Sequence, residues 1–157
     1  MTTTVYVPRE TAAVSLGAHE IAAKLEAVDG VNVIRNGSWG ASWLEPMLEV
    51  VVGDERIAYG PVSVDDVDAL LEAGFLEGGE HSLRLGPTAD IPYLANQERW
   101  TFFRCGLIDP LSIDDFTARK GFAGLQRAFD IGPAAVIDQV RESGLRGRGG
   151  AGFPAGI

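Results

Sequence analysis

The chain has 157 residues, 46% of them hydrophobic and 22% charged, so we expect a packed core rather than disorder. Its 13 basic and 22 acidic residues give a formal net charge of -9, which disfavours binding to nucleic acid and anionic membranes. No apolar run approaches the ~20 residues that span a bilayer, so no membrane insertion is expected. The single cysteine, Cys105, excludes an intramolecular disulfide, and no secretory signal is visible. Both observations favour a cytoplasmic protein.

The charge is distributed unevenly along the chain. Residues 1–86 hold 5 basic and 14 acidic side chains, whereas residues 87–157 hold 8 of each. The pair Gly86-Pro87 lies at this change, and such pairs interrupt regular structure. We therefore expect one domain over 1–86 and a second over 87–157.

The first predicted elements alternate between strand and helix. A β-branched and aromatic run over 3–8 predicts a strand that ends at a proline. Apolar residues at helical spacing over 16–28 predict a helix, and Asp29-Gly30 ends it. Alternating residues over 31–37 predict another strand.

A hairpin and a helix follow in the first part. The apolar runs 47–52 and 56–60 are joined by Gly53-Asp54-Glu55, which is typical of a β-hairpin. Ser63 precedes Asp66 by three residues, a spacing that resembles a capping box at a helix start. The order strand, helix, strand, hairpin, helix predicts an α/β layer protein with a mixed sheet.

The second part begins with a connector over 86–97. The aromatic run 99–110 predicts a strand, and Ser112 followed by Asp115 predicts the start of a helix that ends at Gly121. Two further helices are expected over 121–131 and 132–144. Pro133 suits the first position of the second of these helices, and Gly144 suits its C-terminal cap.

A glycine-rich segment follows the last predicted helix. Glycine permits positive φ and lets backbone N–H groups approach a phosphate or a flat ring. Arg146 and Arg148 add charge that a phosphate could use, and Phe153 offers a stacking face. A dinucleotide fingerprint instead follows a strand and opens a helix. A flexible tail and an RNA-binding Arg-Gly segment are alternatives, and the acidity of the chain argues against RNA.

The stretch SGLRGRGGAGFPAG resembles the signature of the flavoprotein subunit of respiratory complex I and its diaphorase relatives. These relatives include subunits of soluble NAD-reducing hydrogenases and NAD-dependent formate dehydrogenases. The lead-in CGLIDPLSIDDF matches as well, so the resemblance runs from about Ile91 to Gly156. It implies that 87–157 begins an FMN- and NADH-binding domain. In that family, hydride passes between NAD and FMN, and electrons pass to or from iron–sulfur clusters.

The same resemblance assigns cofactor-binding residues in this chain. They are Gly147, Arg148, Gly149, Gly150, Ala151, Gly152 and Phe153. No residue is matched to a catalytic role. The family continues with Thr, Gly, any residue, Lys and Trp, whereas here Ala155 replaces the Thr and the chain ends at Ile157. The ligands of the family's 4Fe-4S cluster would lie further on. We therefore expect an N-terminal part of a longer oxidoreductase subunit, inactive by itself.

The first part resembles the N-terminal extension of the formate dehydrogenase β subunit, through VNVIRNG, GSWGASWLEPMLEVVV and YGPVSVDDV. That extension is a thioredoxin-like domain related to two-iron ferredoxins, whose C-x-G-x-C ligand pair corresponds to Ser38 and Ser42 here. Serine is a poor ligand for iron–sulfur clusters, so we expect a scaffold without a metal. The implied partners are other subunits of a formate dehydrogenase, including a two-iron ferredoxin-like one. A hydrogenase diaphorase and a non-catalytic docking module are the alternatives.

Three other residue types attract attention. We expect Cys105 to be a small buried residue beside the aromatic run, because a free cysteine is usually buried. His19 and His81 have no companion at metal-ligand spacing and are expected at the surface. Trp39 follows Ser38 and Trp43 follows Ser42, and the two tryptophans either fill the space that a cluster would occupy or contact a partner.

Overall fold

A computed structural model describes residues 2–157 and divides them into two compact units. The first unit extends to Phe116 and the second runs from Thr117 to Ile157. This division lies beyond the charge boundary at Gly86. It concerns compactness alone, so the domain ranges 1–86 and 87–157 stay a prediction.

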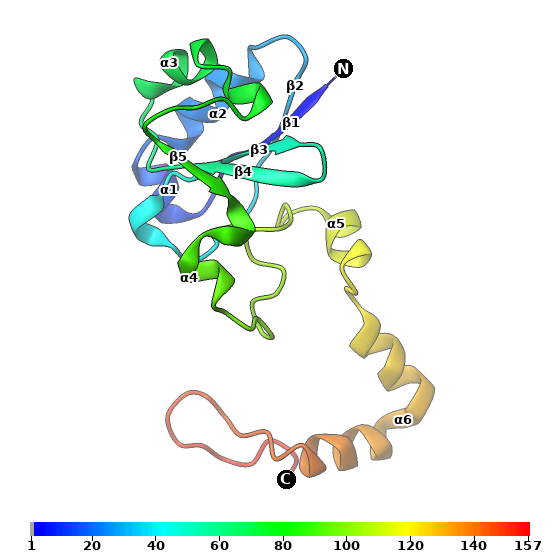
Figure 1. The fold of residues 1–157 in the computed structure, drawn as a ribbon. Coiled ribbons are helices and arrows are strands. Elements are labelled where there is room, and N and C mark those ends of the chain that lie inside the picture. Colours follow the sequence, from blue (N-terminus) through cyan, green and yellow to red (C-terminus); the bar gives the residue numbers. More distant parts are fainter. Residues whose placement is uncertain (1) are drawn as a thin grey trace. The chain divides into compact units, whose positions relative to one another are not determined.

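The first unit is built on one sheet of five strands in the order β2-β1-β3-β4-β5 (Figure 1). β1 and β2 are parallel, and the pairs β1–β3, β3–β4 and β4–β5 are antiparallel. The strands are β1 (Thr3–Tyr6), β2 (Val31–Ile34), β3 (Leu48–Val52), β4 (Glu55–Tyr59) and β5 (Arg84–Pro87). The predicted hairpin is confirmed, whereas β5, at the Gly-Pro pair, was not predicted.

Helices complete this unit. They are α1 (Thr11–Ser15), α2 (Ala18–Glu26), α3 (Asp66–Glu72) and α4 (Pro92–Ala95), with single 3-10 turns η1 (Ser42–Leu44), η2 (Phe75–Glu77) and η3 (Thr88–Asp90). A βαβ unit is therefore followed by a hairpin and a helix on one mixed sheet. The predicted α/β class with a mixed sheet is confirmed, and the thioredoxin-like assignment stays a prediction.

Alternation along the strands gives the sheet two different faces. On one face Ile57 and Tyr59 join the main core, which includes Ile21 of α2 and Leu70 of α3. On the other face Ala58 packs in a smaller cluster with residues such as Leu94 of α4. Burial of both faces explains why the strands are more apolar than those of a half-exposed sheet.

The predicted helix over 16–28 begins later than expected. Gly17 has φ +100° and separates α1 from α2, and Leu16 is 55% exposed. A Cβ atom at Gly17 would lie 2.8 Å from a methyl group of Val64. The close approach of the Val64 side chain therefore requires a glycine at this break.

The predicted strand over 99–110 is wrong, because these residues form consecutive turns. Backbone bonds link Cys105 N–H to the Phe102 carbonyl and Leu107 N–H to the Arg104 carbonyl. Gly106 has φ +80°, which lies outside the extended region of a regular strand. Side chains of the first unit, described below, donate the hydrogen bonds that a neighbouring strand would otherwise provide to the carbonyl groups of Gly106 and Leu107.

The predicted helices after residue 110 are confirmed. α5 (Ile113–Ala118) begins after Ser112, whose Oγ accepts a 3.1 Å hydrogen bond from Asp115 N–H. α6 (Ala123–Glu142) is interrupted at Gly132, which has φ +79° and ψ +166°, so two helical segments meet there as expected. Gly144, with φ +66°, follows the end of α6. Within residues 2–157 we find no helix with the length and apolar character needed to cross a membrane.

Candidate functional site

The glycine-rich segment forms a loop whose two ends pair with each other. Gly147 N–H donates to the Phe153 carbonyl at 2.8 Å, and Ala155 N–H donates to the Leu145 carbonyl at 2.8 Å. Arg146 and Pro154 form an isolated antiparallel bridge between these bonds. Figure 1 shows the loop in red, returning toward the end of α6. The pairing holds 148–152 as the tip of a closed loop.

The tip presents backbone donors that nothing within the described part of the chain satisfies. No hydrogen bond is formed there by the N–H groups of residues 148–153. Gly150 and Gly152 adopt φ +123° and +62°, and a Cβ atom at either would meet nothing within 4 Å. Exposed donors on a positive-φ backbone can bind an anion or the edge of a polar ring. The aromatic ring of Phe153, 63% exposed, adds an apolar surface beside them.

The two arginines of the loop differ in their contacts. Arg146 donates a 3.1 Å hydrogen bond from its guanidinium to the Gly152 carbonyl, across the base of the tip. Arg148 is exposed, and among residues 2–157 its side chain has no hydrogen bond or ion pair. Arg148 is therefore the side chain available to an anionic ligand.

The structure brings all seven predicted cofactor-binding residues, 147–153, into this one loop. Their role in binding stays a prediction. The loop supplies donors, charge and one aromatic face, which suit a phosphorylated, flat cofactor.

A second constellation lies in the first unit around Glu49 of β3, a residue that the sequence analysis did not single out. Its side chain is fully buried on the face opposite the main core. Oε2 accepts hydrogen bonds from Asn36 Nδ2 at 3.1 Å and Trp39 Nε1 at 2.9 Å, and Oε1 accepts one from Thr88 Oγ1 at 2.8 Å. Arg56 lies 3.4 Å away as the ion-pair partner.

Burial raises the pKa of Glu49, and the charge of Arg56 and the hydrogen bonds lower it in part. The carboxylate is thus costly to bury and tolerated because several donors surround it. An acidic residue within the apolar run LEVVV was the only sequence signal of this cluster.

The same cluster holds the turns at 104–107. Asn36 Nδ2 and Arg56 Nη1 both donate to the Gly106 carbonyl, at 2.8 and 3.0 Å, and Arg56 Nη2 donates to the Leu107 carbonyl at 2.8 Å. These side-chain donors replace the backbone partners of a strand. These hydrogen bonds attach the connector to β4 and to the segment after β2, within the first unit.

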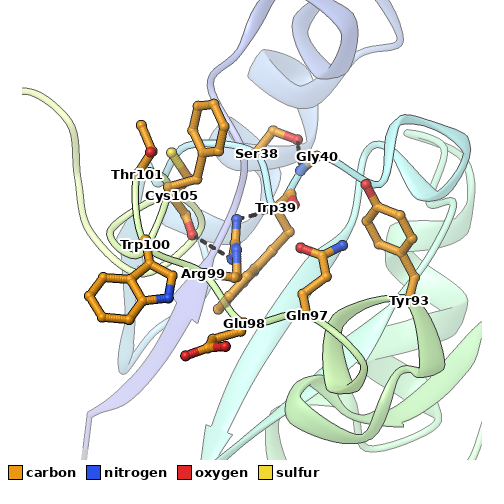
Figure 2. A pocket seen from close by; sticks show the side chains of 11 residues that line it. Ser38, Trp39, Gly40, Tyr93, Gln97, Glu98, Arg99, Trp100, Thr101 and Cys105 are labelled. Carbon is orange, nitrogen blue, oxygen red and sulfur yellow. Dashed lines mark hydrogen bonds between the residues drawn. The ribbon is translucent and has the colours of Figure 1, made fainter. Parts of the chain in front are cut away.

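A hollow of about 590 Å³ is lined by Ser38, the first of the two serines that correspond to the ferredoxin ligand pair, whereas Ser42 is not among its lining residues (Figure 2). Its lining includes Ser38 and Trp39 from the segment before η1, and Tyr93, Trp100 and Cys105 from the connector. Trp39 packs partly against the smaller core cluster. Trp43, by contrast, is 58% exposed and meets Tyr93 edge-on at 4.8 Å between ring centroids.

Ser38 is engaged in local structure. Its Oγ donates to Glu45 Oε1 at 2.7 Å and accepts from Gly40 N–H at 2.9 Å. Burial raises the pKa of Glu45, although the hydrogen bonds from Ser38 and Met47 lower it in part. Among residues 2–157 no group of three or more His, Cys, Asp and Glu side chains is arranged to hold a metal ion. The absence of a cluster from this domain stays a prediction.

The expectation that Cys105 is buried is wrong, because this residue is exposed at the hollow. It sits in a turn at the surface rather than in a core strand. The guanidinium of Arg99 donates to the Cys105 carbonyl at 3.2 Å and to the Trp39 carbonyl at 3.4 Å, so it links two segments that line the hollow (Figure 2).

Comparison with known proteins relates the chain to redox subunits, although no protein-family model matches it. It is 60% identical over 53 residues to the HndC subunit of the NADP-reducing hydrogenase of Solidesulfovibrio fructosivorans, which is 34% of this chain and 11% of that protein. It is 48% identical over 46 residues to the F subunit of the NADH-quinone oxidoreductase of Streptomyces coelicolor, 29% of this chain and 10% of that one. For the corresponding F subunit of Escherichia coli, 37% identity extends over 49 residues, 31% of this chain and 11% of the relative.

The chain thus spans about a tenth of the length of the curated relatives that it matches. These relatives are subunits of multi-subunit oxidoreductases. They support the predicted relationship to the complex I flavoprotein family. None of these three is a formate dehydrogenase subunit, and that finer assignment stays a prediction.

Among solved structures, a thioredoxin-like [2Fe-2S] ferredoxin from Aquifex aeolicus is similar to this chain with a TM-score of 0.45 and 18% identity. The similarity covers 55% of this chain and 93% of the ferredoxin. The wild-type ferredoxin in a second structure gives a TM-score of 0.44 and 22% identity over 54% of this chain and 97% of that one.

Proposed function

We propose that this chain contributes the first part of the flavin and nucleotide site of a diaphorase-type oxidoreductase subunit. The observation that carries the proposal is the closed loop at 147–153, with its free backbone donors, exposed Phe153 and available Arg148. The sequence similarity to HndC and to the F subunits of NADH-quinone oxidoreductases supports the same proposal.

In the proposed role the loop binds FMN, which would accept hydride from NADH and release electrons one at a time. The chain's own residues bind and orient it: the N–H groups of 148–153 donate to polar atoms, and Arg148 pairs with a phosphate. The loop would contact one side of such a ligand and would thus form one part of its pocket. Electrons would then pass to iron–sulfur clusters, including a 4Fe-4S cluster, in other parts of the same complex.

The finer assignment is a formate dehydrogenase complex, in which partner subunits include a two-iron ferredoxin-like one. It is supported by the resemblance of the first part, including the Ser38–Ser42 segment. A hydrogenase complex is the competing assignment, favoured by the 60% identity to HndC. Under either assignment, we propose that the protein is an NAD-dependent subunit in the cytoplasm.

A non-catalytic docking module is the second candidate function. The observation that favours it is the group of exposed aromatic side chains beside the hollow, Trp43 at 58%, Trp100 at 78% and Phe102 at 65% exposure. Exposed aromatic residues of this kind are enriched at protein interfaces.

The test begins with the protein purified from its natural source. Intact mass, FMN content and reduction of ferricyanide by NADH are measured on the same preparation. We expect one FMN for each polypeptide and NADH-dependent reduction. A flavin-free, inactive polypeptide that still co-purifies with its partner subunits would overturn the diaphorase proposal in favour of the docking module. Formate-dependent and hydrogen-dependent reduction of NAD by the purified complex separates the two finer assignments.

A further inference from the structure

Residues 145–147 and 153–155, which are joined by the two backbone hydrogen bonds described above, form the paired base of the loop. Gly156 lies directly after this base and packs against the last turn of α6. It is buried, unlike the residues at the tip. A Cβ atom built on Gly156 would lie 2.6 Å from both the backbone N and the Cα of Arg141, and 2.9 Å from the Arg141 Cβ. These are backbone contacts, which a rotamer change cannot relieve. Only glycine allows this approach of the two backbones.

The contact is adjacent in sequence to the bond that closes the loop. Ala155 N–H donates to the Leu145 carbonyl at 2.8 Å, one residue before Gly156, and Leu145 follows closely on α6. Displacing residue 156 from the helix would therefore displace the donor at 155. The other hydrogen bond of the base, from Gly147 N–H to the Phe153 carbonyl, would then no longer be supported by the adjacent bond from Ala155.

We propose that Gly156 is a positioning residue for the glycine-rich loop, seating the paired base on α6 so that the donors at the tip keep one arrangement before a ligand arrives. A preorganised loop binds more tightly than a mobile one because less conformational entropy is lost on binding. Gly156 acts through the base and touches no ligand. The proposal rests on the proposed function of the loop in binding FMN.

The test compares Gly156→Ala with Gly124→Ala. Neither glycine has a positive φ, and a Cβ atom at Gly124 of α6 meets nothing within 4 Å, so the control adds the same methyl group without a clash. Amide hydrogen exchange of Gly147 and Ala155 is measured in both variants of the full chain. We expect exchange at these two amides to accelerate by about tenfold or more in Gly156→Ala and not in Gly124→Ala. Exchange along α6 should stay as in the parent protein.

The functional readout is the dissociation constant for FMN, measured by fluorescence titration of the flavin-binding protein. We expect Gly156→Ala to weaken binding by about tenfold, with an unchanged unfolding midpoint. Unaltered exchange and affinity would overturn the inference. So would equal acceleration throughout α6, because that result would give Gly156 a general structural role.

A second variant, Ala155→Pro, removes the N–H donor of the base without adding bulk at residue 156. If Gly156→Ala fails to fold, Ala155→Pro should still speed exchange at Gly147 and weaken FMN binding, and parent-like values for both would overturn the inference. The two proposals fail differently. A parent protein that binds no FMN refutes the proposed function, whereas the exchange measurements continue to decide the role of Gly156.

Discussion

The indole N–H of Trp39 donates a 2.9 Å hydrogen bond to Oε2 of the buried carboxylate of Glu49. Trp39 precedes η1, whereas Glu49 lies in β3, with Ala58 of β4 opposite it. The bond thus ties the segment that resembles a ferredoxin ligand loop to the centre of the sheet. Gly106 packs on the same indole ring, so one tryptophan links the sheet and the connector.

Replacing Arg56 with Met tests the electrostatic part of this cluster. The change leaves Glu49 buried without its cation and removes the bonds to the carbonyls of Gly106 and Leu107. We expect the free energy of unfolding to fall by about 3 kcal/mol at neutral pH, measured by urea unfolding. Lys24→Met, which breaks the exposed pair with Asp68, should change it by less than about 1 kcal/mol.

The loss in Arg56→Met should also depend on pH. The folded-state pKa of Glu49 is raised above its ordinary value of 4.5, so the folded protein binds the proton more tightly than the unfolded chain. Stability from this group is therefore present at low pH and is lost as pH rises through the raised pKa. Without Arg56 the pKa rises further, so the deficit should be smaller at about pH 5 than at about pH 7. A deficit that is equal at both pH values would contradict this account.

Gly106→Ala tests the packing of the connector on Trp39. The added Cβ atom would lie 2.2 Å from an indole ring atom, and the backbone has φ +80°. We expect a loss of about 2–4 kcal/mol, the sum of overpacking and left-handed strain. Gly86→Ala is the matched control, because φ there is +89° and a Cβ atom meets nothing within 4 Å. If Gly106→Ala loses no more stability than Gly86→Ala in thermal unfolding, the indole ring of Trp39 moves aside at no cost and the packing argument is wrong.

Ser63→Ala tests the hydrogen bonds between Ser63 and Asp66, the first residue of α3. Ser63 donates from its backbone N–H at 2.8 Å and from its Oγ at 2.6 Å to the carboxylate of Asp66. These bonds, the side-chain one first, hold the pKa of Asp66 below its ordinary value. We expect a loss of about 1 kcal/mol or less in chemical unfolding at neutral pH. Because a lowered carboxyl pKa stabilises the fold above the unfolded value, this loss should shrink as acid protonates Asp66. An unchanged unfolding midpoint in Ser63→Ala would show that the bond from Ser63 Oγ to Asp66 does not stabilise the start of this helix.

Arg148→Ala tests the proposed ligand contact of the loop. Loss of a charge-assisted bond to a phosphate should weaken FMN binding by about tenfold in a fluorescence titration. Arg127→Ala on α6 removes the same charge from an exposed residue away from the loop and should leave the affinity unchanged. Equal affinities for the two variants would exclude a specific contact from Arg148.

The local patterns of this sequence determined much of the fold. The hairpin at Gly53-Asp54, the helix starts shortly after Ser63 and Ser112, and the break at Gly132-Pro133 depend on neighbouring residues, and short-range rules describe such features well. The seven loop residues 147–153 were picked out by the resemblance of their motif to the complex I flavoprotein family, and among them Gly150 and Gly152 adopt the positive φ that glycine permits.

Only the tertiary structure decided the form of the connector and the surroundings of Glu49. The run 99–110 has the composition of a strand, yet donors from Asn36 and Arg56, far away in sequence, satisfy its carbonyls and keep it in turns. Cys105 is exposed for the same reason. The contact between Gly156 and the backbone of Arg141 could not be predicted from the sequence either, because it depends on the path by which the loop returns to α6. Contacts between distant segments leave little trace in local composition, and these contacts place the buried carboxylate and close the loop.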